Sequence, residues 1–263
     1  MEFFEGLDDY GTYYQVNKVE GTVPILFIHG VGLDHSIWKT QTDYFTNQTT
    51  IIYDLICHGR STCLLDEIHI ENFAMQIDGL LEILRVNKII IVGFSLGGLI
   101  AAHYASTRQS MIKKTILLGT IYSRSTKEQK SSAQRYQTAE KNYLNIPEQL
   151  ERWFNKDYLV ANPKVGEAIS NILKSNNVTD FLKSYKLFSF FEDKMINFDK
   201  IISPTLIVTG EKEVGSTPEM SHNMSKIIHK SKVTIISEGK HFCNIECAKE
   251  VNKVFEKFIE TKI

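Results

Sequence analysis

The sequence contains few of the residues and patterns that mark specialised classes of protein. Its 263 residues include only four cysteines, too few for a disulfide-stabilised scaffold in a chain of this length. No apolar run approaches the roughly 18 residues of a membrane span, and the acidic N-terminus lacks the basic and apolar regions of a secretory signal. We therefore expect a cytoplasmic protein in which Cys57, Cys63, Cys243 and Cys247 are free thiols.

The sequence also lacks an excess of positive or negative charge, which excludes some classes of partner. The formal net charge is −1, so neither nucleic acid nor an anionic membrane is expected as a main partner. Cys243 and Cys247 lie close to His241, but the second Cys or His pair of a structural zinc site is missing, so no metal site is predicted. Hydrophobic residues make up 43% of the chain, enough for a sizeable core.

What the sequence does contain is an alternation of strand-like and helix-like segments. Apolar residues three and four positions apart predict helices at residues 71–86 and 246–260. Nearly continuous apolar runs predict strands covered on both faces, which implies an α/β fold with a mostly parallel central sheet flanked by helices. Residues 10–22 are expected to add antiparallel strands at one edge. The six predicted buried strands are residues 23–30, 49–56, 87–94, 113–120, 204–211 and 231–238.

One region interrupts this alternation. Between residues 123 and 199 no buried strand is predicted, and a polar stretch is followed by helical spacing with many aromatic residues. We therefore predict a helical cap at 123–199 over a core formed by residues 1–122 and 200–263, with packing helices that have no role at a site as the alternative. Residues 124–200 carry 13 Lys and Arg against 10 Asp and Glu, which would suit an acidic carrier protein or an ordinary solvated surface.

A serine stands at a predicted turn between a strand and a helix. The stretch IIIVGFSLGGLIAAHYAS, residues 89–106, contains the pattern G-x-S-x-G, with Gly93 and Gly97 on either side of Ser95. Such a turn holds its middle residue in a strained backbone conformation and at a helix N-terminus, where negative charge is favoured. Ser95 is therefore a candidate nucleophile, and a simple helix N-cap is the alternative interpretation.

A serine hydroxyl becomes a good nucleophile only when a base removes its proton, and the base needs a partner that orients it. His241 is favoured as the base because it lies between a strand-like run and the last helix, whereas His29 is followed directly by glycine. Glu211 and Glu213 come just after a predicted strand, at the edge where open α/β sheets place their site residues. The order serine, acid, histidine is typical of the nucleophile-elbow pattern.

Five stretches in order resemble motifs of the α/β-hydrolase superfamily, and together they cover nearly the whole chain. Two features depart from the family pattern. Ile56 and Cys57 stand where other members usually have Pro or Arg and then Gly, and Glu213 stands where Asp is usual. The matching stretches are HGVGLDHSIW (29–38), YDLICHGRST (53–62), GFSLGG (93–98), TGEKEVGSTP (209–218) and GKHFCNIE (239–246).

The resemblance implies a role for each matching residue. Ser95 would be the nucleophile, His241 the base and Glu213 the acid, with Glu211 as the nearby substitute. The backbone N–H groups of Val31 and Leu96 would form the oxyanion hole.

Other residues of these motifs would shape the site. Val31, Phe94 and Val214 are expected to line an apolar approach to the nucleophile. His29 and Asp54 are expected to brace the oxyanion loop and a strand end.

The pattern is most similar to the small capped esterases and lactonases, such as pimeloyl-carrier-protein methyl ester esterases and 3-oxoadipate enol-lactonases. This similarity implies a carboxylesterase (EC 3.1.1 type) that works through an acyl-enzyme, with no metal or organic cofactor. Its expected partners are a small ester or acyl substrate, or an acyl carrier protein. Lactones and carbon–carbon bonds are alternative targets. Hydrolase-fold signalling proteins and hormone receptors resemble the HGVGLDHSIW stretch too, so a ligand receptor is the alternative outside enzymes.

Overall fold

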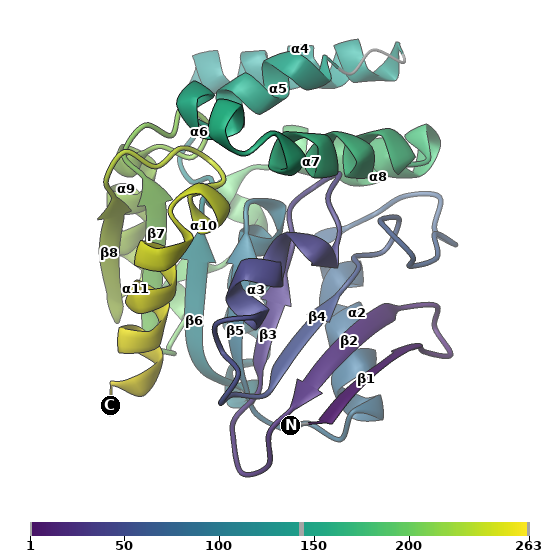
Figure 1. Ribbon diagram of the computed structural model, residues 1–263, viewed down its shortest axis with the longest axis vertical. Coiled ribbons are helices and arrows are strands. Elements are labelled where there is room, and N and C mark those ends of the chain that lie inside the picture. The colour runs from purple at the N-terminus through teal and green to yellow at the C-terminus, as the bar shows by residue number, and fades with distance from the viewer. Residues whose placement is uncertain (1, 142–144, 262–263) are drawn as a thin grey trace.

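The computed structural model describes residues 2–141 and 145–261, and its centre is an eight-stranded sheet (Figure 1). The strand order is β1-β2-β4-β3-β5-β6-β7-β8. β2 pairs antiparallel with β1 and β4, and every other pair of neighbours is parallel, which confirms the predicted mostly parallel sheet. The strands are β1 (Glu2–Leu7), β2 (Tyr13–Lys18), β3 (Ile25–Ile28), β4 (Thr50–Tyr53), β5 (Ile89–Phe94), β6 (Ile112–Leu118), β7 (Thr205–Gly210) and β8 (Ser231–Ile236).

The parallel strands are the six apolar runs of the sequence, and helices cover them on both faces. Along β5, Ile89 and Ile91 pack into one core, and Ile90 and Val92 pack into the other. This alternation explains the continuous apolar run, because both faces of the strand are buried. Helices α2 (Ile70–Ile83), α3 (Leu96–Thr107) and α9 (Pro218–Ile227) contribute to the first core. The second core receives the 3₁₀ helix η1 (His35–Trp38), α10 (Cys243–Glu246) and α11 (Ala248–Glu260), and the four-residue α1 (Lys39–Thr42) follows η1.

A layer of helices joins β6 to β7 and lies over the ends of the sheet strands (Figure 1). We call the described residues of 124–189, which include α4–α8, the helical layer. It occupies most of the insertion predicted at 123–199, of which residues 142–144 lie outside the described residues. Ser125 and Glu128 begin the layer with a capping box, because each side chain bonds the backbone N–H of the other. The helices are α4 (Thr126–Glu140), α5 (Ile146–Trp153), α6 (Lys156–Ala161), α7 (Pro163–Ser175) and α8 (Val178–Ser189).

Three short 3₁₀ helices complete the secondary structure of the described residues. They lie in the connections after α3 and after the helical layer. They are η2 (Gln109–Met111), η3 (Asp193–Met195) and η4 (Phe198–Lys200).

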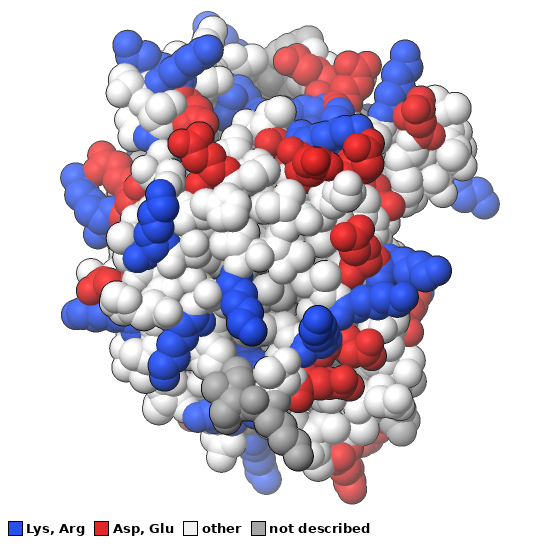
Figure 2. Space-filling model, turned by 90° about the vertical axis from the view of Figure 1, so that its left-hand side faces the viewer, with Lys and Arg blue, Asp and Glu red and all other residues white. Residues whose placement is uncertain are grey.

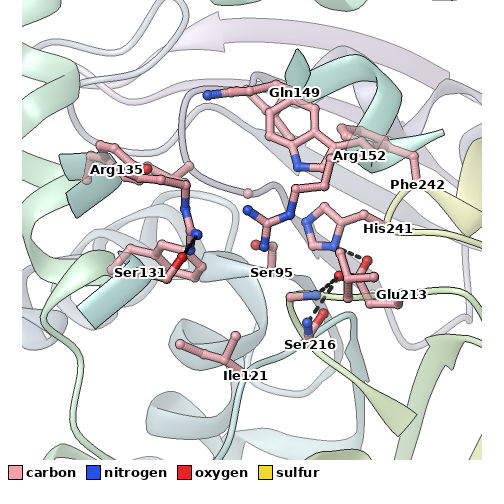
Figure 3. Close-up of a pocket in the computed structure, with 18 of the residues that line it drawn as sticks. Ser95, Ile121, Ser131, Arg135, Gln149, Arg152, Glu213, Ser216, His241 and Phe242 are labelled. Carbon is pink, nitrogen blue, oxygen red and sulfur yellow. Dashed lines mark hydrogen bonds and ion pairs between the residues drawn. The ribbon is translucent and has the colours of Figure 1, made fainter. Parts of the chain in front are cut away.

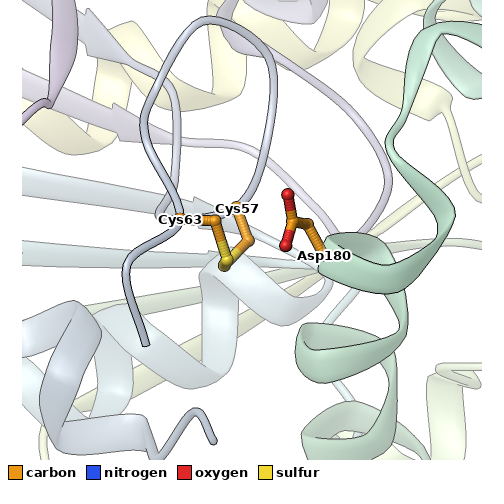
Figure 4. A group of neighbouring side chains, drawn as sticks. All are labelled: Cys57, Cys63 and Asp180. Carbon is orange, nitrogen blue, oxygen red and sulfur yellow. A yellow bond between two sulfur atoms is a disulfide. The ribbon is translucent and has the colours of Figure 1, made fainter. Parts of the chain in front are cut away.

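Two cysteines differ from the sequence expectation. Cys57 and Cys63 form a disulfide beside Asp180 of α8, so the prediction of four free thiols is wrong for this pair (Figure 4). The loop turns back on itself at Cys57, which has a φ of 64°, and brings the two Cα atoms to 4.4 Å. That separation is within the range a disulfide spans. Cys243 and Cys247 are free, as expected.

On the face of the molecule shown in Figure 2, Lys and Arg side chains are interspersed with Asp and Glu side chains. This mixture agrees with the net charge of −1. Within residues 2–141 and 145–261, no helix combines the length and apolar character that crossing a membrane requires.

Candidate active site

Ser95 lies at the turn between β5 and α3, with φ 56° and ψ −114°. Positive φ is strained for a residue with a side chain and costs about 1–3 kcal/mol. The turn is fixed because the Ser95 N–H donates to the Leu118 carbonyl at 2.9 Å. It is tight because a Cβ on Gly93 would collide with the Gly97 carbonyl, and one on Gly97 with the Ile28 carbonyl. The Ser95 side chain makes no hydrogen bond to the helix end, so the N-cap interpretation is not supported.

His241 and Glu213 come from the loops that follow β8 and β7. The Nδ1 atom of His241 is 2.8 Å from Oε2 of Glu213. The other carboxylate oxygen, Oε1, accepts hydrogen bonds from the backbone N–H groups of Gly215 and Ser216, the latter at 3.1 Å. Glu213 is therefore held at both oxygens, and the extra methylene of Glu relative to Asp is accommodated by the loop that folds around its carboxylate.

The surroundings of Glu213 keep its carboxylate charged. Burial by itself raises the pKa of this group. The charge and hydrogen bond of His241, together with the N–H groups of Gly215 and Ser216, outweigh burial and lower the pKa to about 2. Glu211 is different: it is exposed, and its carboxylate accepts from Ser237 Oγ and the Glu238 N–H. The structure thus pairs Glu213, and not Glu211, with the imidazole.

Ser95 and His241 face the same cavity (Figure 3). Ser95 is only 5% exposed, but it forms part of the cavity wall, so a ligand in the cavity would reach it. Among the described residues no hydrogen bond joins its hydroxyl to the imidazole. Catalytic hydrogen bonds often tighten only when substrate is bound, so this geometry is compatible with a nucleophile and its base.

The loop after β3 lies against the serine. A Cβ on Gly30 would be 3.2 Å from the Ser95 Cβ, so the backbone at Gly30 passes next to Ser95. Val31 lines the cavity. Leu96 is the first residue of α3, where the backbone N–H has no partner inside the helix. These are the two N–H groups that the motifs associate with an oxyanion hole.

Two buried polar residues brace this loop. The Leu55 N–H donates to Nε2 of His29 at 3.0 Å, and Nδ1 of His29 lies 2.8 Å from the Gly30 carbonyl. Burial lowers the pKa of His29 to about 4, so its ring is neutral at pH 7. Asp54 accepts from the His35 N–H at 2.8 Å and the Arg60 N–H at 2.8 Å. Both residues therefore hold backbone in place, as expected.

Phe94 occupies a different position from the one predicted. Its side chain is fully buried, and its ring centroid is 4.7 Å from that of His241. Phe94 therefore packs on the imidazole instead of lining the approach to Ser95, because β5 directs position 94 into the second core. Val214 does belong to the cavity wall, at a 61% exposed position.

The cavity has a volume of about 320 Å³ and lies between the sheet and the helical layer. The layer contributes residues that the sequence analysis did not single out. Its apolar side chains include Trp153, whose ring centroid is 6.1 Å from that of His241. Its basic side chains in the cavity wall are Arg124, Arg135 and Arg152. The basic composition of residues 124–200 was the only sign of them in the sequence.

Comparison with known proteins agrees with this architecture. Among curated proteins, the (E)-2-((N-methylformamido)methylene)succinate hydrolase of Acinetobacter baylyi is 25% identical over 244 residues, covering 90% of each chain. The 3-oxoadipate enol-lactonase 2 of the same organism is 21% identical over 250 residues, covering 94% of this chain and 91% of the relative. The crystal structure of the enol-lactonase from Burkholderia xenovorans has a TM-score of 0.87 at 20% identity and covers 95% of this chain and 96% of its own.

A family model provides the assignment. The model described as alpha/beta hydrolase fold matches residues 23–247, which include the serine turn and both loops that hold Glu213 and His241. The motif-based resemblance found in the sequence is thereby confirmed. This chain belongs to the alpha/beta hydrolase fold family, as one of its hydrolases.

Proposed function

We propose that this hydrolase is a serine carboxylesterase that cleaves a small ester through an acyl-enzyme intermediate. Ser95 is the nucleophile, His241 the general base and Glu213 the residue that orients the imidazole. The observation that carries the proposal is the 2.8 Å contact between His241 Nδ1 and Glu213 Oε2, at the wall of a cavity that also exposes the strained Ser95.

The first half of the reaction forms the acyl-enzyme. The Ser95 hydroxyl attacks the substrate carbonyl carbon while Nε2 of His241 accepts the hydroxyl proton, and Glu213 stabilises the resulting imidazolium. The carbonyl oxygen becomes an oxyanion that the N–H groups of Val31 and Leu96 bind. Each such donor contributes about 3 kcal/mol to transition-state stabilisation. When the tetrahedral intermediate collapses, the bond to the leaving oxygen breaks and the imidazolium returns its proton to the alcohol.

The second half releases the acid. Water enters, His241 removes one of its protons, and the hydroxide attacks the acyl carbon. The bond to Ser95 Oγ then breaks, and the serine regains its proton from the imidazolium. In this scheme the helical layer acts as a cap, because its side chains form one wall of the cavity that contains Ser95 and limit the access of bulk water.

Lactone hydrolysis is the second candidate, and it uses the same steps with a leaving group that stays attached to the acyl part. The full-length similarity to proteins named enol-lactonases supports it. Cleavage of a carbon–carbon bond is chemically possible with the same three groups, but these two relatives are not named for it. The alternative of a ligand receptor predicts single turnover with retained product.

Covalent labelling and a substrate panel test the proposal. A fluorophosphonate probe should label the wild-type protein at Ser95, and Ser95→Ala should abolish the label. Labelling of the Ala variant would assign the nucleophile elsewhere. Assays of p-nitrophenyl esters, lactones and acyl-carrier methyl esters side by side should give multiple turnovers on esters or lactones. A burst of one product per protein, followed by retention of that product, would support the receptor.

A further inference from the structure

Three arginines of the helical layer line the cavity that contains Ser95. Arg124 precedes α4, Arg135 lies on α4 and Arg152 on α5. All three are half-buried. Figure 3 shows that the side chains of Arg135 and Arg152 project into the cavity, toward each other and above Ser95. The cavity therefore concentrates positive charge next to the predicted nucleophile.

Within residues 2–141 and 145–261, no carboxylate forms a salt bridge with the guanidinium groups of Arg124, Arg135 or Arg152. The two acidic residues of the cavity wall have other partners. Glu213 binds His241 and two backbone N–H groups, and Glu128 binds the backbone and hydroxyl of Ser125.

The arginines differ in the partners they do have. Arg124 donates to the Phe188 carbonyl at 2.9 Å and lies 4.8 Å from the centroid of its ring. Arg135 donates to Ser131 Oγ at 2.7 Å. The guanidinium of Arg152 makes no hydrogen bond to the described residues, although a guanidinium has five N–H donors. A Cβ on Gly215 would be 2.7 Å from its Nη2 atom, so this guanidinium lies close to the loop that holds Glu213.

Electrostatics in the cavity favour a bound anion. Burial, followed by repulsion from Arg135, lowers the pKa of Arg152, and the same two causes lower that of Arg124 to about 10. Glu213, Glu148 and Tyr185 act in the opposite direction on Arg152. An anion between the guanidinium groups would remove the repulsion and supply acceptors for their donors.

We propose that Arg135 and Arg152, with Arg124 behind them, form a carboxylate-binding subsite, so that the preferred substrate is an ester or lactone whose acyl part carries a second, free carboxylate. Arginine suits this role because its planar fork binds a carboxylate through two parallel hydrogen bonds. The inference rests on the proposed function for the reacting carbonyl. A carboxylate subsite also explains part of the basic charge of the layer, because these three arginines line the cavity. An acidic carrier protein is then not required to explain them.

The test compares two esters of equal chain length that differ in charge. Mono-p-nitrophenyl glutarate carries a carboxylate at the end of a five-carbon acyl chain, and p-nitrophenyl pentanoate carries a methyl group there. The wild-type protein should have the higher kcat/KM on the glutarate ester. Arg152→Gln and Arg135→Gln should each lower kcat/KM on that ester by about 10- to 100-fold, the loss typical of a charge-assisted hydrogen bond. On the pentanoate ester their effect should stay below about threefold.

Matched variants separate a subsite from a structural role. Lys130→Gln removes one positive charge from an exposed position of α4, and it should change neither ester's kcat/KM. Arg152→Lys should recover part of the glutarate rate because it restores the charge without the fork. Equal losses on both esters would overturn the inference, as would a wild-type preference for the uncharged ester.

A binding experiment keeps the inference independent of turnover. In Ser95→Ala, free glutarate should raise the unfolding temperature and bind by calorimetry, and adding Arg152→Gln should weaken that binding about 10-fold or more. No glutarate binding, combined with normal hydrolysis of neutral esters, would refute the subsite alone. Glutarate binding without hydrolysis of either ester, and without labelling of Ser95, would refute the proposed function and leave the subsite standing.

Discussion

Replacing Glu213 with Gln should remove the negative charge beside His241 while leaving the shape of the site unchanged. Gln has the same length, and its amide oxygen can still accept from the N–H groups of Gly215 and Ser216 that now bind Oε1. The substitution removes the negative charge 2.8 Å from His241 Nδ1. It also allows an amide N–H to face that nitrogen, which favours the wrong tautomer of the imidazole.

The magnitude follows from the pKa of Glu213. This pKa drops from 4.5 to about 2 even though burial opposes the change. At about 1.4 kcal/mol for each pH unit, the surroundings favour the charged carboxylate by roughly 3 kcal/mol, and His241 makes the largest favourable contribution. Removing the charge takes away the His241 share of this free energy, and an incorrect tautomer of the imidazole brings the expected loss of kcat to about 10²- to 10⁴-fold.

Steady-state hydrolysis of a p-nitrophenyl ester measures this loss, and the urea unfolding curve of each variant checks that it is folded. Glu211→Gln is the matched control. Its carboxylate is exposed and bonded to Ser237 and the Glu238 N–H, so its rate should equal that of the wild-type protein. A Glu213→Gln rate within threefold of wild type would refute the assignment of the acid. A large loss in Glu211→Gln would transfer the role to that residue.

Two further predictions concern stability. Gly97→Ala should lower the free energy of unfolding by about 2 kcal/mol or more, because its Cβ would collide with the carbonyl groups of Ile28 and His29; an unchanged urea midpoint would contradict this close approach. Acidification should also destabilise the protein, because burial lowers the pKa of His29 to about 4 and that of His58 to about 3, from 6.5. The folded state then binds fewer protons than the unfolded chain, so the stabilisation is complete above pH 6.5 and decreases as pH falls, by about 2 kcal/mol per histidine at pH 5. Urea unfolding at pH 7 and pH 5 measures this loss, which His58→Gln should reduce by about half; equal slopes in both proteins would contradict the argument.

Much of the fold was predictable because its signals are local. Each parallel strand is a run of β-branched and aliphatic residues between turn residues, so the six strands could be located to within a few positions. The strand order and the pairing of Glu213 with His241 depend on contacts between distant segments, which the sequence suggested only through the order of the family motifs. β1 was not foreseen, because it is a half-exposed edge strand in which Phe3 is 57% exposed.

Features that depend on side-chain direction were harder to predict. Phe94 was expected to line the approach to Ser95, but strand alternation directs its side chain into the core, where it packs on His241. The Cys57–Cys63 disulfide depends on a left-handed turn at Cys57, and a six-residue spacing alone does not indicate such a turn. Arg124 precedes α4 and Arg135 lies on it, and α4 is polar on most sides, so no periodic pattern shows which of its side chains face the cavity.

The closeness of Arg152 to Gly215 links two parts of the molecule that are far apart in the chain. A Cβ on Gly215 would come within 2.7 Å of Arg152 Nη2 and 3.0 Å of Glu213 Oε1. Any side chain introduced there would displace both Arg152, which we propose to bind the substrate carboxylate, and Glu213, which we propose to align His241. Variants in which α5 is exchanged to change substrate selectivity should therefore keep glycine at position 215. Otherwise α5 and the loop that contains Gly215 have to be redesigned together.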